Sequence, residues 1–430
     1  MDNKKFERNR SPEKKFDIGA KLRKKYEDAR RKRLERQATQ DVIFSEPITP
    51  VEQSKPAPLA KGGIDICFLL IVFALLCFGA IMSYSASSFE SERYYGNSAH
   101  YFIRHLMFIA GSICVTIPVV LISRPWFWRV FGIGSYAVSV LLLLLVLIIG
   151  TSGGGAQRWI QVGPITIQPS EIAKMAIVLI LALVMSKYES KVRRIQRFDG
   201  DFKYGVLIPG GLVASICLLV ALEKHISGLM IIGMIGIAVM FLGGTRLRWI
   251  LMIIGIVGAC GCLLILVSSY AQVRVNTWLH INEVNPLGEA WQTLQGLNAI
   301  GSGGFFGRGL GNSVLKSYVS EPQNDFIFTI LCEELGFFGA ALAIGLFCLL
   351  IWRGFKIAKG APDRFCSLVV YGLTLKTALQ ALMNIAVVTN SMPNTGIALP
   401  FFSAGGTSLM IQIFEMGIIL SISRYSSVKK

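Results

Sequence analysis

Apolar runs of about 20 residues recur along this 430-residue chain, and no other feature limits its fold as strongly. A helix of that length crosses the hydrocarbon core of a bilayer and makes its backbone hydrogen bonds internally. The runs are continuous rather than alternating, which argues against a membrane barrel of strands. They cover residues 64–86, 101–122, 127–150, 169–187, 204–222, 226–243, 249–270, 326–352, 366–389 and 404–423. The sequence therefore predicts an all-α polytopic membrane protein with ten transmembrane helices.

Lysine and arginine residues set the orientation of these spans, because cytoplasmic connections carry an excess of them. They gather in alternate connections, most densely at 187–203 and again at 353–364. Those connections, and with them the N- and C-termini, are assigned to the cytoplasm. The longest connection, 271–325, lies between spans seven and eight and becomes a large extracytoplasmic loop. Loops of this length in a compact protein are usually functional.

A basic block, KLRKKYEDARRKRLERQ, lies in the polar segment 1–61 that precedes the first span. We expect 1–61 to be a mostly disordered cytoplasmic tail that is attracted to anionic lipid. A nucleic-acid-binding arm is the less favoured alternative, so no nucleic-acid partner is predicted. Residues 62–424 form the predicted membrane domain, and 425–430 a short cytoplasmic tail.

Polar residues that interrupt the apolar pattern collect on the predicted outer side, first around the start of the fourth span. Arg158 follows a glycine-rich stretch, and Pro169 suits the first turn of a helix that also holds Glu171. Glu171 and Lys174 are three residues apart, so they share a helix face and can neutralise each other. A paired charge that locks the helix and a direct role in substrate binding both fit Arg158, Glu171 and Lys174.

The connection ALEKHISG, residues 221–228, places three ionisable groups between two apolar runs. Charges at a membrane edge are functional candidates by default. They can equally cap the two adjoining helices. Glu223 is taken from this stretch as a candidate substrate-binding residue.

Three charged residues end the large outer loop. The glycine-rich stretch before them lacks the strand-then-helix context of a dinucleotide site, so no organic cofactor is predicted. Its glycines favour tight turns or close approach to a bulky ligand. Lys316, Glu321 and Asp325 then precede a helix. Asp325 could simply cap that helix, yet a cap accounts for neither Lys316 nor Glu321.

A fourth stretch, 390–409, carries proline, glycine and hydroxyl residues where the chain turns into the membrane. Such backbone is tolerated at membrane depth only where it is buried in protein or lines a watery cavity. The sequence thus implies a polar cavity on the outer face, with Ser403 as a candidate substrate contact.

These stretches, in this order, resemble the SEDS family (shape, elongation, division, sporulation), the group that contains FtsW, RodA and SpoVE. The matching segments read RWI…QPSEIAK at 158–174, AIGSGGFFGRGLGNS at 299–313, EPQNDFIF…EELGFFG at 321–339 and PNTGIALPFFSAGGTSL at 393–409. The resemblance covers nearly all of 64–423 and is greater to FtsW and SpoVE than to RodA. Two positions depart from the family pattern: Lys224 replaces a common proline, and Ala404 a common tyrosine.

The resemblance implies a ten-helix peptidoglycan glycosyltransferase that polymerises lipid II and releases polyprenyl pyrophosphate. It implies Asp325 as the catalytic carboxylate, an important Glu171–Lys174 pair and a role for Arg158. It also implies a multi-pass protein of the bacterial plasma membrane, at the division septum, with an extracytoplasmic active site. The implied partners are a class B penicillin-binding protein transpeptidase and other division proteins.

The expected mechanism uses Asp325 as a general base. It would take the proton from the acceptor sugar's 4-hydroxyl as that oxygen attacks the donor's anomeric carbon. Lys316 and Arg158 would stabilise the departing pyrophosphate. A divalent cation, Mg²⁺ or Mn²⁺, is a further candidate for that task, with Asp325 and Glu321 as its candidate ligands. Alternatively, Glu321 is a substrate-binding residue that positions Lys316.

Three alternatives stay open at this point. A lipid II flippase would use the same cavity, but it needs polar groups along a path through the bilayer. A structural scaffold for division proteins would need no catalytic Asp325. The same polymerase chemistry could serve sporulation, as in SpoVE, or elongation, as in RodA, instead of septal wall synthesis.

Overall fold

The computed structural model describes residues 62–153, 156–163, 165–192, 202–281, 283, 285, 288, 290–319 and 322–425. The predicted tail 1–61, the end of the chain at 426–430 and Glu321 lie outside these ranges. Within them, ten helices are long and apolar enough to cross a membrane. They are α2 (Ile66–Tyr95), α3 (His100–Ile122), α4 (Pro125–Ile149), α5 (Pro169–Lys187), α8 (Ile208–Leu222) with the π-helical turn η1 (Lys203–Leu207) before it, α9 (Ile226–Gly243), α10 (Leu247–Val267), α13 (Ile327–Lys359), α14 (Arg364–Val388) and α15 (Gly406–Ser423). The predicted ten-span helical fold is confirmed.

Some helices begin and end where the apolar runs do. Others continue beyond the apolar run into polar sequence. Helices α5 and α9 coincide with the predicted 169–187 and 226–243. Helix α2 instead continues past the predicted end at 86 as far as Tyr95. It stops at Gly96, which adopts φ 62° and donates its N–H to Glu92 O, as glycine does after many helix ends.

A small antiparallel sheet joins α4 to α5, and the apolar-run analysis did not predict it. It consists of β1 (Thr151–Gly153), β2 (Ala156–Val162) and β3 (Ile165–Ile167), in that spatial order. Thr151 pairs with Trp159 across β1 and β2, and Ile160 with Ile167 across β2 and β3. Since β3 ends two residues before Pro169, the sheet holds Arg158 of β2 close to the start of α5.

The large connection between the seventh and eighth spans also contains regular structure. Helices α11 (Ser269–Leu279) and α12 (Trp291–Gly303) and the 3₁₀ turn η2 (Leu315–Ser317) lie within or beside the predicted loop. Short helices of mixed polarity carry no membrane-length run, so the pattern that located the spans could not locate them. The remaining short helix, α6 (Glu189–Val192), follows α5.

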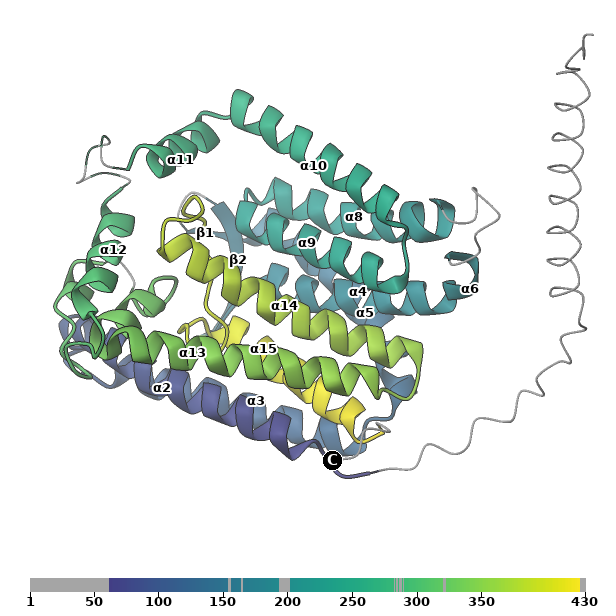
Figure 1. The fold of residues 1–430 in the computed structure, drawn as a ribbon, viewed down its shortest axis with the longest axis horizontal. Coiled ribbons are helices and arrows are strands. Elements are labelled where there is room, and N and C mark those ends of the chain that lie inside the picture. The colour runs from purple at the N-terminus through teal and green to yellow at the C-terminus, as the bar shows by residue number, and fades with distance from the viewer. Residues whose placement is uncertain are drawn as a thin grey trace, which may run out of the picture. The chain divides into compact units, whose positions relative to one another are not determined.

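Helix α5 lies at the centre of the bundle. It packs against α4, α9 and α14, and 78% of its most apolar window is buried. Helices α13 and α2 run side by side, as do α3 and α15 (Figure 1). By contrast, only 6% of the corresponding window of α10 is buried, and this helix lies at the edge of the bundle in Figure 1. The functional site is therefore to be sought around α5.

Candidate active site

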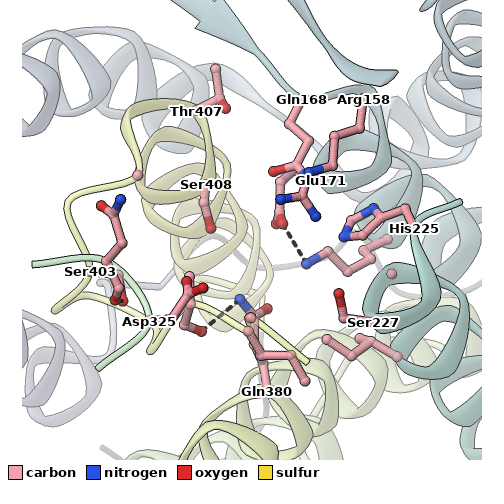
Figure 2. Close-up of a pocket in the computed structure, with 18 of the residues that line it drawn as sticks. Arg158, Gln168, Glu171, His225, Ser227, Asp325, Gln380, Ser403, Thr407 and Ser408 are labelled. Atoms are coloured by element: carbon pink, nitrogen blue, oxygen red, sulfur yellow. Dashed lines mark hydrogen bonds and ion pairs between the residues drawn. The ribbon is translucent and has the colours of Figure 1, made fainter. Parts of the chain in front are cut away.

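A cavity of about 160 Å³ lies at one end of α5 (Figure 2). Its walls come from β2, from the first turns of α5, α9 and α15, from α14, and from the loops before α13 and α15. The predicted site residues that line it are Arg158, Glu171, Lys174, Asp325 and Ser403. With His225, Ser227 and Gly228 from the ALEKHISG connection, residues of all four polar stretches meet at this cavity.

Asp325 is held in the cavity wall through its backbone. The Asn384 side chain on α14 donates one hydrogen bond to Asp325 O (2.7 Å) and another to Ile397 O (2.6 Å). Ser403 Oγ donates to Asn324 O (2.5 Å). These hydrogen bonds connect the segment before α13 to the loop before α15. Ser403 therefore lines the cavity and also holds these two segments together.

Helix capping does not explain Asp325. Helix α13 begins at Ile327, its cap position is Phe326, and no side chain caps it. The capping alternative is therefore wrong. Gly396, at φ 62°, lies against the carboxylate, and a Cβ there would be 2.9 Å from Asp325 Oδ2. A glycine is thus required beside the Asp325 carboxylate.

The opposite wall of the cavity carries the basic residues, as Figure 2 shows. Lys174 Nζ lies 2.7 Å from Glu171 Oε1, and both side chains are buried. The second carboxylate oxygen of Glu171 and the buried Nε of Arg158 have no hydrogen-bond partner among the described residues. Burying polar atoms without partners is costly, so these two atoms are suited to meet a bound molecule.

Three helices begin at this cavity. Gln168 and Glu171 line it from the start of α5, Ser227 and Gly228 from the start of α9, and Gly405, Thr407 and Ser408 from the start of α15. The first turn of a helix has unpaired N–H groups and the positive end of the helix dipole. Together with Arg158 and Lys174, these helix ends favour an anionic ligand such as a phosphate.

Other predicted site residues lie elsewhere. Lys316 does not line the cavity; its Nζ donates to Gly311 O (2.9 Å) and lies 3.9 Å from Glu334 Oε1, which ties the loop before α13 to that helix. Glu223 is 1% exposed and also does not line the cavity, and neither carboxylate oxygen has a partner among the described residues. Burial raises the pKa of Glu223 to about 8. Glu321 lies outside the described residues.

His225, two positions from Glu223, lines the cavity instead. Its Nδ1 lies 3.2 Å from Ser170 Oγ on α5. Burial, helped by the positive charges of Arg158 and Lys174, lowers the pKa of His225 to about 3. The ALEKHISG signal had pointed to this turn, but the choice between its ionisable residues depends on backbone direction, which a sequence pattern does not give.

A second buried ion pair lies deeper in the bundle, and the sequence analysis missed it. Lys376 Nζ on α14 lies 2.7 Å from Glu415 Oε2 on α15 and 2.9 Å from Gln412 Oε1. Charges inside apolar runs are rare and informative, so this pair had a signal in the sequence. Because each charge is neutralised locally, the pair joins two helices without opening a polar path.

The described residues do not contain a preformed metal centre, since no three His, Cys, Asp or Glu side chains cluster among them. Among the described residues, two carboxylates line the cavity: Asp325 on one wall and Glu171 on the opposite wall. Mg²⁺ often binds through one or two carboxylates together with substrate phosphates. The residues therefore fit a cation shared with a bound phosphate, rather than one held by the protein alone.

Comparisons with known proteins agree over nearly the whole membrane domain. The family model for FtsW, RodA and SpoVE, described as "Cell cycle protein", matches residues 66–428. Stage V sporulation protein E of Bacillus subtilis is 37% identical over 371 residues, which cover 85% of this chain and 98% of that protein. A probable peptidoglycan glycosyltransferase FtsW of Trichlorobacter lovleyi is 36% identical over 372 residues, 86% of this chain and 95% of that protein.

A solved structure described as "Structural coordination of polymerization and crosslinking by a peptidoglycan synthase complex" contains a chain of the same fold. The TM-score is 0.70 with 23% identity, over 84% of this chain and 98% of that chain. At that identity the likeness concerns the fold alone. The extent of the family match and the identity to both curated relatives lead to one conclusion: the chain belongs to the FtsW, RodA and SpoVE family of cell cycle proteins.

Proposed function

We propose that this protein is a peptidoglycan glycosyltransferase that polymerises lipid II into glycan strands during septal wall synthesis. One observation carries the proposal: a single cavity has the Asp325 carboxylate on one wall and, on the other, basic residues among helix N-termini. Glycosyl transfer from a lipid pyrophosphate needs both, a base for the acceptor hydroxyl and positive charge for the leaving group. The name of the FtsW relative, a probable peptidoglycan glycosyltransferase, supports the same activity.

In the proposed reaction Asp325 accepts the proton of the acceptor sugar's hydroxyl while that oxygen forms a bond to the donor's anomeric carbon. The bond from that carbon to the pyrophosphate oxygen breaks, and polyprenyl pyrophosphate leaves. The fastening of Asp325 by Asn384 and by the Ser403 loop supports such a role, because a base must be held within hydrogen-bond reach of the proton it takes.

Negative charge develops on the pyrophosphate as it leaves. Arg158 and Lys174 are proposed to meet that charge, assisted by the first turns of α5, α9 and α15. Glu171 would hold the Lys174 ammonium in place through their 2.7 Å contact. A divalent cation bound by Asp325 and the substrate's phosphates would supply further Lewis-acid stabilisation.

Replacing Asp325 by Asn tests the proposal, since the amide keeps the shape and cannot take the proton. We expect Asp325→Asn to lower strand formation from purified lipid II by roughly 10²-fold or more. Glu283→Gln is the matched control: it makes the same chemical change at an exposed carboxylate of the outer connection and should retain full activity. Normal polymerisation by a folded Asp325→Asn protein would refute the role of Asp325.

The transporter alternative receives little support from the buried charges. Lys376–Glu415 and Arg353–Asp65 are each paired within 3 Å and buried, so they join helices rather than line a route. Proteoliposomes loaded with lipid II distinguish the two activities: glycan strands indicate the polymerase, whereas passage of lipid II across the bilayer without strands indicates the transporter.

Partner, location and active-site face are parts of the same proposal. A class B penicillin-binding protein transpeptidase is the proposed partner, since the solved complex of the same fold is described as coupling polymerization to crosslinking. Co-purification with such a partner, followed by strand synthesis with and without it, tests this part. Localisation of a fluorescent fusion to the septum tests the division role against the sporulation and elongation alternatives.

A further inference from the structure

His225 is presented to the cavity by an unusual turn between α8 and α9. Lys224 adopts φ 57° there, a conformation that non-glycine residues rarely take. Gly228, one turn into α9, lies so close to the His225 ring that a Cβ would be 2.6 Å from Nδ1. The turn and the glycine together place the imidazole against α5, where it lines the cavity.

Ser170 determines which ring nitrogen carries the hydrogen. Ser170 is fully buried, and its one hydrogen bond to the described residues is the 3.2 Å contact with His225 Nδ1. A hydroxyl has a single proton to donate. If Nδ1–H donated to Ser170, that buried hydroxyl proton would have no acceptor, which is unfavourable. His225 lines the cavity, and its Nε2 is not among the fully buried atoms without a partner. The arrangement that leaves no fully buried donor unpaired therefore has Ser170 donating to Nδ1 and the ring hydrogen on Nε2.

This arrangement makes His225 a neutral hydrogen-bond donor. Burial keeps the ring uncharged near neutral pH by lowering its pKa; the positive charges of Arg158 and Lys174 add to this effect, and the Glu171 carboxylate opposes it. Its Nε2 has no hydrogen-bond partner among the described residues. The ring lies on the same side of the cavity as Arg158 in Figure 2, and Lys174 lines the same cavity. These positive charges favour an anionic oxygen as the acceptor.

We propose that His225 Nε2–H donates a hydrogen bond to a phosphate oxygen of the polyprenyl pyrophosphate group, and that Ser170 positions it by fixing the tautomer. This inference rests on the proposed glycosyltransferase function. It assigns a substrate contact to His225, whereas the sequence had indicated Glu223 as the candidate in this connection. The donor itself should not change its protonation state between about pH 6 and pH 8, because the pKa of His225 lies well below that range.

Affinity for polyprenyl pyrophosphate, measured directly on the full-length protein in nanodiscs, tests the contact apart from turnover. We expect His225→Leu to weaken binding by roughly tenfold to a hundredfold, as for a lost hydrogen bond to a charged group. His225→Gln, whose amide can place an N–H near the Nε2 position, should restore most of it. His105→Leu is the control, because His105 is also buried but does not line the cavity.

A spectroscopic measurement tests the tautomer without any substitution of His225. The chain has four histidines, so ¹⁵N-histidine spectra should resolve a His225 signal with a protonated Nε2 and an unprotonated Nδ1. Ser170→Ala should turn this signal into a mixture of tautomers and weaken pyrophosphate binding severalfold. A protonated Nδ1 in the unchanged protein, or unaltered binding by a folded His225→Leu variant, would overturn the inference.

The two proposals fail in different ways. If the unchanged protein makes glycan strands but pyrophosphate binding does not depend on His225, only the inference about His225 is wrong. If the unchanged protein makes no strands from lipid II under any condition tested, the proposed function itself is wrong.

Discussion

Glu223 shows how a single buried residue can affect stability without touching the cavity. Its carboxyl group is 1% exposed, and neither oxygen is hydrogen bonded to the described residues. Burial raises its pKa from 4.5 to about 8, so the folded protein keeps a proton that the unfolded chain has lost. This stabilisation is complete below the unfolded pKa and is lost as pH rises through the folded pKa.

The pH dependence of unfolding tests this interpretation of Glu223. Between about pH 5 and pH 8 the free energy of unfolding should fall, by on the order of 3–5 kcal/mol at most. Glu223→Gln should remove that part of the slope, because the amide has no proton to lose. Thermal unfolding in detergent at several pH values measures it. An unchanged slope in Glu223→Gln, with Glu283→Gln as the exposed control, would contradict the assignment.

The Glu171–Lys174 pair allows a prediction of a different kind, because both partners are buried at 2.7 Å. Lys174→Met leaves Glu171 charged and buried, which should cost roughly 3–5 kcal/mol of unfolding free energy. The double variant Glu171→Gln/Lys174→Met leaves no charge and should recover most of that loss. Thermal unfolding of Lys174→Met, of Glu171→Gln and of the double variant measures the coupling. Additive losses would show that the two charges do not depend on each other.

At the scale of elements, α13 contains a residue with non-helical backbone angles. Gly336 interrupts it at φ 63°, ψ −158°, and the glycine-rich loop between α12 and α13 packs against the break. Arg308 N donates to Glu333 O, Gly309 N donates to Glu334 O, and Phe337 N donates to Gly304 O. At the break, backbone groups of α13 form hydrogen bonds with the backbone of the glycine-rich loop.

Two glycines of this region give a matched comparison. A Cβ at Gly307, which has φ 76°, would lie 2.1 Å from Glu334 O, whereas a Cβ at Gly301 on α12 meets nothing within 4 Å. We expect Gly307→Ala to lower the free energy of opening of this loop by about 1–3 kcal/mol. Gly301→Ala should be neutral or slightly stabilising. Hydrogen exchange of the loop measures this. Equal protection in both variants would show that the loop is not held through Gly307.

The sequence predicted the helices that an apolar, membrane-length run marks. It did not predict the elements whose structure depends on tertiary contacts. Helix α5 could be predicted because an apolar run and a proline mark its bounds. The sheet that carries Arg158 could not, since its strands are short and their pairing is decided by tertiary position. Asp325, Glu171 and Lys174 lie at the same cavity as expected. Lys316 does not, because its stem turns toward Gly311 and α2 instead.

For the whole molecule, chain direction alone explains why these residues meet. In a bundle of ten spans that cross in alternating directions, the even-numbered spans all begin on one side. Helices α5, α9, α13 and α15 are the fourth, sixth, eighth and tenth spans, and the cavity is lined by the first turns of α5, α9 and α15 and by the segment before α13. One face of the bundle therefore collects the positive helix ends and Asp325 together.

The orientation of the bundle decides which compartment that face meets, and the excess of lysine and arginine predicts the extracytoplasmic one. An alkaline phosphatase fused after Asn285, in the connection before α13, should be active only if that connection is outside. A green fluorescent protein fused after Gly360, between α13 and α14, should fluoresce only if that turn is inside. The reverse pattern would place Asp325 on the cytoplasmic side, where glycan strands are not extended. It would contradict a polymerase whose active site faces the outside of the cell, whatever the chemistry of the cavity.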